Sequence, residues 1–276
     1  MNMRKVLLGS SPVSVVVLAG LSCVAGCRTY NAAPPEARGN GAMALQLVRE
    51  AERTMHWAGG IADFWLPWEA RMEEPSDKAP QDRDEFEAIL HEAIALLKQA
   101  LELDPDLHRA RFDIAVIHLR LKEAELAETW AKNFLTNKPN DPQGLELLSM
   151  LYFSGRKWKE LAELCEAAFP ALKAACAEPT TEYVPDLSYF MRTAAIAHFY
   201  MGELEEAREW AEAAIRDDDD DVQNYLFLAI IQHAQGDTEG VAETRATLKE
   251  LDPETEQALD GTIEAAEKER LKGSQP

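Results

Sequence analysis

The residue types that most often do chemistry are scattered along this sequence. Histidine occurs at positions 56, 91, 108, 118, 198 and 233, and no two histidines have the spacing of an H-E-x-x-H zinc site. The sequence also lacks a C-x-x-C pair, a glycine-rich phosphate loop and a G-x-S-x-G nucleophile. The many glutamates fall on the expected outer faces of helices, where they are solvated. We therefore expect no catalytic residues, no metal site and no cofactor.

The densest local charge is the run Asp217–Asp221, which places five carboxylates in succession. Calcium-binding loops alternate acidic residues with others and need a glycine for the turn, and this run has neither feature. It predicts a solvated turn between two helices. Asp219 and Asp221 are the alternative metal ligands within the run.

The amino terminus has the pattern of a targeting segment. Arg4 and Lys5 precede Val6–Val24, which is apolar or small throughout and carries no charge. Such a stretch is typical of a secretory signal, and an uncleaved membrane helix is the alternative. It ends in Val24-Ala25-Gly26-Cys27, which resembles the bacterial lipoprotein signal. The resemblance implies cleavage after residue 26, lipidation of Cys27 and attachment to a membrane of the cell envelope.

The residue after Cys27 indicates to which membrane the lipidated chain would be attached. Position 28 is arginine and not aspartate. By resemblance to Gram-negative lipoproteins, that residue implies the periplasmic face of the outer membrane.

Cys165 and Cys176 would be the remaining thiols of the exported chain. On one straight helix, eleven residues span about 16 Å, which is too far for a disulfide. A break at Pro170 would remove that obstacle, so both a disulfide and two free thiols are compatible with the sequence.

The charge balance excludes one class of partner. The formal net charge is −21, from 28 basic and 49 acidic residues, and 46% of the chain is hydrophobic. Binding to nucleic acid needs a positive face, so we expect no nucleic-acid partner. An acidic body is also repelled by anionic lipid headgroups, so a lipid would tether the protein without laying it on the bilayer.

Apolar periodicity predicts helices that come in pairs. Between His108 and Pro139, the small residues Ala115 and Ala127 stand where two helices would cross closely. Pro105 and Pro139 lie 34 residues apart. A period of 34 with two helices per unit resembles the tetratricopeptide repeat. The resemblance implies an all-α fold, a right-handed α-solenoid of about five helical hairpins with a C-terminal capping helix.

The period sets the expected boundaries. We expect a signal peptide over 1–26, a linker over 27–41, an array over 42–253 and a capping helix and tail over 255–276. Within the array we expect a split first repeat over 42–105 and further repeats over 108–141, 142–173, 188–221 and 222–254. An irregular segment is expected between Lys173 and Pro185.

The insertion that splits the first repeat carries three closely spaced aromatic residues, Phe64, Trp65 and Trp68. A polar loop would not contain these residues. They are expected either to dock on a partner or the membrane interface, or to fold back and plug apolar surface at the end of the array.

The resemblance also implies where a partner binds, because the first helices of such repeats line a concave groove for peptides or proteins. Aromatic and arginine side chains are enriched at interface hot spots. The competing interpretation is that the aromatic residues of these first helices only pack between helices or under the 174–187 insertion. A second functional reading is an accessory solute-binding lipoprotein of a transport system, with a pocket closed by the aromatic insertion. The groove residues, carried over by register, are Arg109, Phe112, Val116, Arg120, Met150, Phe153, Tyr189, Arg192, Phe199 and Tyr200, which we call the first-helix face.

Overall fold

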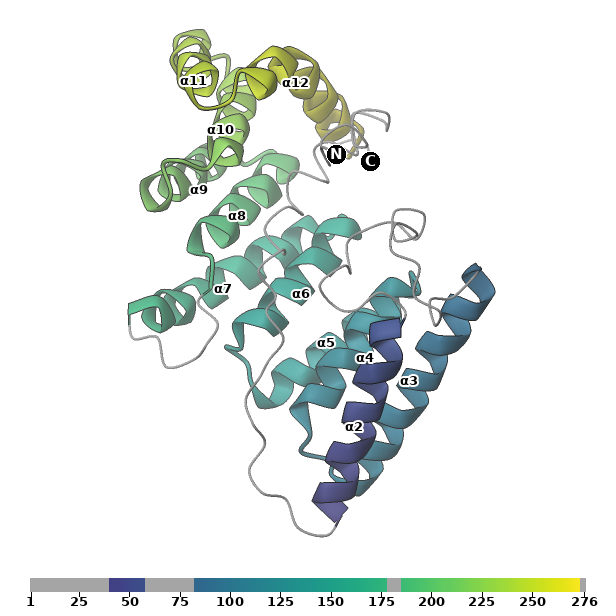
Figure 1. Ribbon diagram of the computed structural model, residues 1–276. Helices are drawn as coiled ribbons and strands as arrows, with labels where there is room; N and C mark the ends of the chain where they lie inside the picture. Colours follow the sequence, from purple (N-terminus) through teal and green to yellow (C-terminus); the bar gives the residue numbers. More distant parts are fainter. Residues whose placement is uncertain (1–39, 58–81, 178–184, 274–276) are drawn as a thin grey trace. The chain divides into compact units, whose positions relative to one another are not determined.

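The computed structural model describes residues 40–57, 82–177 and 185–273, and all regular secondary structure in these ranges is α-helix (Figure 1). The expected all-α fold is therefore confirmed. The predicted signal, Cys27, linker positions 27–39 and the residues Phe64, Trp65 and Trp68 lie outside the described residues. The last two positions of the predicted linker, Asn40 and Gly41, already belong to the first helix. The helices are α2 (Asn40–Trp57), α3 (Arg83–Leu103), α4 (His108–Arg120), α5 (Ala124–Asn137), α6 (Pro142–Ser154), α7 (Trp158–Ala177), α8 (Leu187–Met201), α9 (Leu204–Asp217), α10 (Val222–Gln235), α11 (Thr238–Leu251) and α12 (Pro253–Gly273).

The chain divides into two compact units, and the boundary lies inside α6, after Leu151. The N-terminal unit contains α2 to α5 and most of α6, and the C-terminal unit contains the end of α6 and α7 to α12. Consecutive helices pack as hairpins within each unit, in the pairs α2–α3, α4–α5, α8–α9 and α10–α11. None of the helices in these ranges is both long and apolar enough to cross a bilayer.

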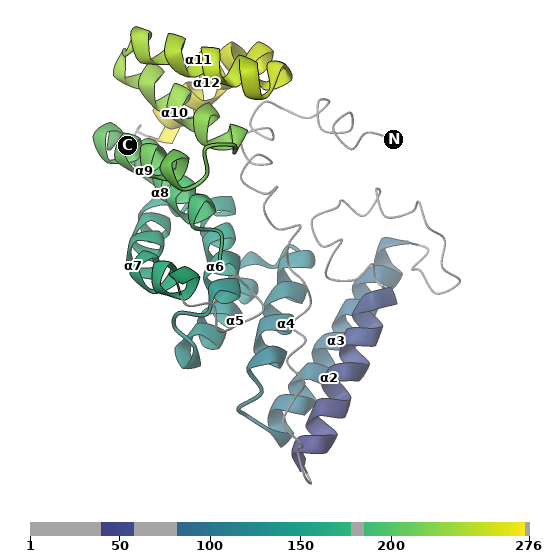
Figure 2. The same cartoon turned by 60° about the vertical axis from the view of Figure 1, so that its left-hand side comes forward.

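The first hairpin forms although a long insertion separates its two helices. Figures 1 and 2 both show α2 and α3 lying side by side. Ala44, Val48 and Ala51 of α2 are buried in one apolar cluster with Leu90 and other residues of α3. Small side chains on α2 allow the two backbones to approach closely, which is the role that the repeat pattern gives to them.

Gly144 provides another close approach, between α6 and α5. A Cβ atom at this position would lie 2.6 Å from two ring carbons of Phe134 and 2.8 Å from a methyl carbon of Leu135. We expect Gly144→Ala to lower the free energy of unfolding by about 1–3 kcal/mol, because overpacking outweighs the gain in helix propensity. Chemical denaturation measures this. Gly261 on α12 has open space around its Cα, and Gly261→Ala is expected to stabilise by about 0.5–1 kcal/mol.

The core of the C-terminal unit lies between α8, α9, α10, α11 and α12. Ile196, Ile230, Leu248 and Leu259 are almost fully buried in one cluster. Helix α7 differs from the expectation, because it continues through Pro170 to Ala177 instead of ending near Lys173. Proline removes one backbone hydrogen bond from a helix. Leu172 is 1% exposed, so apolar packing beyond the proline stabilises the continued helix.

Four of the turns between consecutive helices share one backbone feature, a residue in the left-handed region. The residues are Lys122 at φ 62° between α4 and α5, Arg156 at φ 55° between α6 and α7, Gly202 at φ 83° between α8 and α9, and Gly236 at φ 76° between α10 and α11. Between α6 and α7 the sequence predicts that Gly155 separates the helices, but its arginine neighbour adopts the left-handed conformation. The left-handed region costs an ordinary L-residue about 1–2 kcal/mol, so two turns of the array carry strain.

We expect Lys122→Gly to raise the free energy of unfolding by about 0.5–1 kcal/mol, because glycine removes the strain but adds unfolded-state entropy. The side chain of Lys122 is exposed, so little packing is lost. Urea denaturation of the full chain measures the change. Lys122→Ala is the control and should give no gain, because alanine keeps the Cβ atom that causes the strain.

Candidate protein-binding surface

The first-helix face was predicted to be a contact surface, and in the N-terminal unit the structure places most of its residues inside the fold. Phe112, Val116 and Met150 are between 5% and 9% exposed. The ring of Phe112 packs on that of Phe134 in α5, with 5.5 Å between centroids. These side chains therefore hold α4 to its own hairpin. Arg120 is half-buried in the last turn of α4.

Arg109 has a specific role within this unit. Its Nε atom donates to Oδ2 of Asp113 at 3.0 Å, and its Nη2 atom lies 3.6 Å from Oε1 of Glu52 on α2. Asp113 is fully buried, and burial raises its pKa to about 6, against the opposing effect of the Arg109 cation. Arg109 therefore compensates a buried acid and connects α4 to α2.

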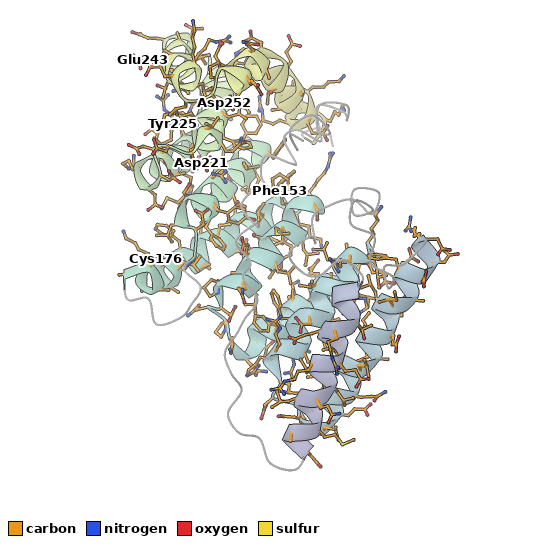
Figure 3. All side chains as sticks on the ribbon, in the orientation of Figure 1. Phe153, Cys176, Asp221, Tyr225, Glu243 and Asp252 are labelled. Atoms are coloured by element: carbon orange, nitrogen blue, oxygen red, sulfur yellow. The ribbon has the colours of Figure 1, made fainter. Side chains whose placement is uncertain are left out.

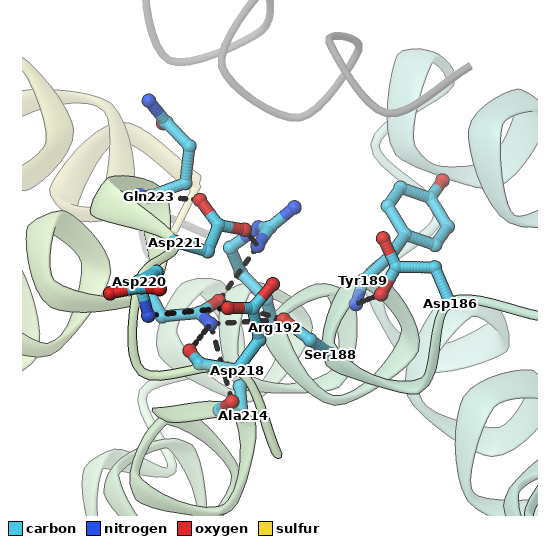
Figure 4. Close-up of polar contacts among 10 residues, drawn as sticks. Asp186, Ser188, Tyr189, Arg192, Ala214, Asp218, Asp220, Asp221 and Gln223 are labelled. Atoms are coloured by element: carbon cyan, nitrogen blue, oxygen red, sulfur yellow. Dashed lines mark hydrogen bonds and ion pairs between the residues drawn. The ribbon is translucent and has the colours of Figure 1, made fainter. Parts of the chain in front are cut away.

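In the C-terminal unit, Arg192 is the centre of a buried polar network (Figure 4). It is 1% exposed, it forms an ion pair with Asp221, and its Nη1 atom donates to Oδ1 of Asn224 at 2.7 Å. Asn224 in turn donates to Oγ of Ser188 at 2.9 Å and to the carbonyl oxygen of Ala214 at 3.2 Å. Arg192, which the sequence suggested for partner contact, therefore joins α8 to the start of α10.

The same network explains one end of the acidic run. Asp221, labelled in Figure 3, caps α10 by accepting a hydrogen bond from the backbone N–H of Gln223 at 2.9 Å, while its other oxygen faces Arg192 (Figure 4). Asp218 accepts from the backbone N–H of Asp220 at 3.2 Å and remains exposed. Among the described residues, no three potential ligand side chains converge as a metal site. The run is a helix connection with one structural carboxylate.

Three members of the first-helix face do come together, around a tryptophan that the sequence reasoning missed. Trp158 of α7 stacks on Tyr200 with 4.3 Å between ring centroids, and Phe153 meets Trp158 edge-on at 5.6 Å. Phe199 contacts Tyr200 at 5.3 Å. We call Phe153, Trp158, Phe199 and Tyr200 the aromatic cluster. Only its position next to a turn residue, in the order Arg-Lys-Trp, could have pointed to Trp158.

Helix α12 lies over this cluster. The guanidinium of Arg270 is 5.4 Å from the centroid of Phe199, and Glu269 forms an ion pair with Arg156, beside the cluster. Burial together with the nearby Glu269 carboxylate raises the pKa of Tyr200 to about 12. The predicted capping helix is thus present, and it reaches past its own repeat to the turn before α7.

His198 and the two cysteines of α7 show no sign of a catalytic arrangement within the described residues. His198 is bonded on both ring nitrogens, with Nδ1 2.7 Å from Glu203 and Nε2 2.8 Å from Glu166. Cys165 and Cys176 are both free thiols on α7. Burial raises the pKa of the Cys165 thiol far above its usual range, so the thiol is a poor nucleophile.

Comparison with models of protein families identifies repeats in two stretches of the chain. Models of the tetratricopeptide repeat match residues 90–151 and 192–243. The chain therefore contains tetratricopeptide repeats over these two stretches. The first match contains Pro105 and Pro139, between which the 34-residue period was found, so the family resemblance is confirmed by an independent comparison. Comparison with curated proteins gives no match.

Solved tetratricopeptide-type structures share the fold. MamA from Desulfovibrio magneticus RS-1 superposes with a TM-score of 0.56 at 14% identity, covering 79% of this chain and 98% of that one. Pseudomonas aeruginosa pilF gives a TM-score of 0.52 at 12% identity, covering 86% of this chain and 90% of that one. At these identities the likeness concerns the fold alone. It supports a helical repeat array.

Proposed function

We propose that this protein is a non-enzymatic, lipid-anchored scaffold of the cell envelope that binds a protein or peptide partner on its repeat array. The observation that carries the proposal is the tandem hairpin architecture, matched by the repeat family over two separate stretches. Such arrays present many similar helices to a partner and bury their own apolar residues between neighbours. The acidic composition further favours a protein partner over nucleic acid.

Attachment to the membrane follows in this proposal from the Val24–Cys27 tetrapeptide. We expect Cys27→Ala to move the protein from the membrane fraction to the soluble or precursor pool, because the thiol that receives the lipid is gone. Fractionation of cells combined with metabolic labelling by a fatty-acid analogue measures this. Equal labelling and equal membrane association of the Cys27→Ala protein would exclude lipid anchoring at this residue.

Binding of a partner is tested by site-specific photo-cross-linking in intact cells. A photo-reactive residue replaces Arg120 on α4 or His233 on α10, which are side chains of first helices that retain exposure. The matched controls replace Leu126 on α5 or Glu243 on α11, which are exposed on second helices. We expect one discrete adduct from the first-helix positions and none from the second-helix positions.

Two outcomes contradict the proposal. Equal adducts at all four positions indicate nonspecific contact, and no adduct at Arg120 or His233 removes the first helices as the binding face. Each variant is compared with the wild-type melting temperature, so a loss of the adduct is separated from a loss of the fold.

A further inference from the structure

Helix α12 is held to the C-terminal unit in two different ways along its length. Leu259, Ile263 and Ala266 are at most 3% exposed and belong to the apolar core. Beyond Ala266 no apolar side chain with a described environment is buried, and Leu271 is 56% exposed. The last two turns of α12, residues 267–273, therefore depend on charged contacts.

Those charged contacts are of the kind that contributes little. In the Arg156–Glu269 pair, the arginine side chain is 56% exposed and the glutamate 11% exposed, and Glu267 lies 3.7 Å from Nε2 of the half-exposed His233. Exposed ion pairs contribute little to stability, whereas burying Leu259 or Ile263 contributes several times more. The last two turns are therefore held less firmly than the first four.

The surface beneath these turns is aromatic, and the side chain that covers it is charged. The floor is the aromatic cluster, in which Phe199 is 3% exposed and Tyr200 is stacked on Trp158. Arg270 of α12 lies over Phe199 in a cation–π contact, which contributes less than the burial of an apolar side chain there would. Arg156 offers a cation beside the cluster, in a turn whose backbone is strained at φ 55°. A segment with a carboxylate for Arg156 and an apolar side chain over Phe199 would fit this surface better.

We propose that the aromatic cluster and Arg156 form a docking site for an acidic amphipathic helix of the partner protein, and that the last two turns of α12 occupy this site until the partner displaces them. The inference rests on the proposed scaffold function and assigns it a site and a class of partner. The partner helix is expected to resemble the end of α12, which is a helix with Glu269 directed at Arg156. It is expected to differ from α12 in one respect, an apolar residue at the position that Arg270 occupies in α12.

The test uses the full chain and a defined peptide probe. The probe is a fluorescent peptide of residues 260–273, kept helical by a lactam between Glu264 and Lys268, which both point to solvent on α12. The receptor variant Glu269→Arg sets two like charges against each other at Arg156 and releases the resident turns. We expect the probe to bind this variant about tenfold more tightly than wild type, because a larger fraction of the receptor has an open site.

Two further changes test the recognition itself. A probe with leucine in place of Arg270 is expected to bind the Glu269→Arg chain about tenfold more tightly than the original probe, since an apolar contact replaces a charged one. Adding Arg156→Glu to the Glu269→Arg chain is expected to abolish binding, because it restores an internal ion pair and repels the glutamate of the probe. Glu264→Arg in the receptor makes the same charge change away from the cluster and should behave as wild type.

The inference is overturned if the probe binds wild type and Glu269→Arg equally, or if Arg156→Glu leaves binding unchanged. Absence of probe binding to every variant, with adducts retained at Arg120 and His233, removes the docking site and leaves the scaffold proposal standing. Conversely, probe binding that follows the expected pattern without any cellular adduct contradicts the scaffold proposal alone.

Discussion

Arg192→Met lowers the free energy of unfolding by about 3 kcal/mol, because it leaves Asp221 and Asn224 facing a site that has lost its cation. The side chain of Arg192 is 2% exposed and that of Asp221 is 21% exposed, so water partly solvates the Asp221 carboxylate after its counter-ion is removed. We therefore expect a loss at the lower end of the range for buried pairs. Urea denaturation followed by circular dichroism measures it.

A second arginine provides a matched control. Arg208 reaches from α9 to Asp237 at 2.8 Å, across the same repeat boundary and over the same 29 residues, but 36% of its side chain is exposed. Arg208→Met should change stability far less, because solvent screens that pair. A double variant Arg192→Met with Asp221→Asn should recover part of the loss, since asparagine still caps α10 without a charge. Equal losses for both single arginine variants would show that burial does not determine the effect.

Asp113→Asn raises the free energy of unfolding above about pH 6, by up to about 3 kcal/mol, and has little effect below about pH 4. The cause is burial, which raises the pKa of Asp113 from 3.8 to about 6. In the unfolded chain the carboxyl ionises at the lower pH and gains hydration, so the stability of the wild type falls as the pH rises between these two values. Asparagine does not ionise, so the variant avoids this loss.

The measurement is the difference in unfolding free energy between variant and wild type over a series of pH values. The difference should increase between about pH 4 and about pH 6 and then stay level, which separates Asp113 from other titrating groups. Asp84→Asn, at an exposed position in the first turn of α3, is the control and should give a difference without this step. A constant difference for Asp113→Asn would show that its carboxyl is not destabilised by burial.

Sequence periodicity predicted the helical hairpins because small residues recur where paired helices cross. Ala115 and Ala127 are fully buried where that pattern places them, and so are Ala195 and Ala207 in the hairpin of α8 and α9. The pattern could not locate the end of α7, because Pro170 signals a break and the decisive factor is packing farther along the helix. Nor could it assign the left-handed residue in the turn between α6 and α7, since glycine adopts a positive φ more readily than arginine and Gly155 lies next to Arg156.

The binding-face prediction was harder for a physical reason. Register indicates which side of a helix a residue occupies, but it does not indicate what covers that side. Arg192 has the residue type of a hot spot, yet its counter-ion lies 29 residues farther along the chain and neutralises it inside the fold. Likewise, the charged end of α12 reads as a solvated face, although Glu269 is 11% exposed against Arg156. Whether the remaining first-helix side chains contact a partner stays a prediction.

The Arg192–Asp221 pair also constrains the order in which the chain can complete its structure. Arg192 precedes its counter-ion by 29 residues in the chain. Until Asp221 is in place, the hairpin of α8 and α9 has to keep in water a guanidinium that its finished form encloses. This hairpin therefore reaches its final packing only together with the start of α10. Although each repeat resembles an independent module in sequence, the C-terminal end of this array matures as one block.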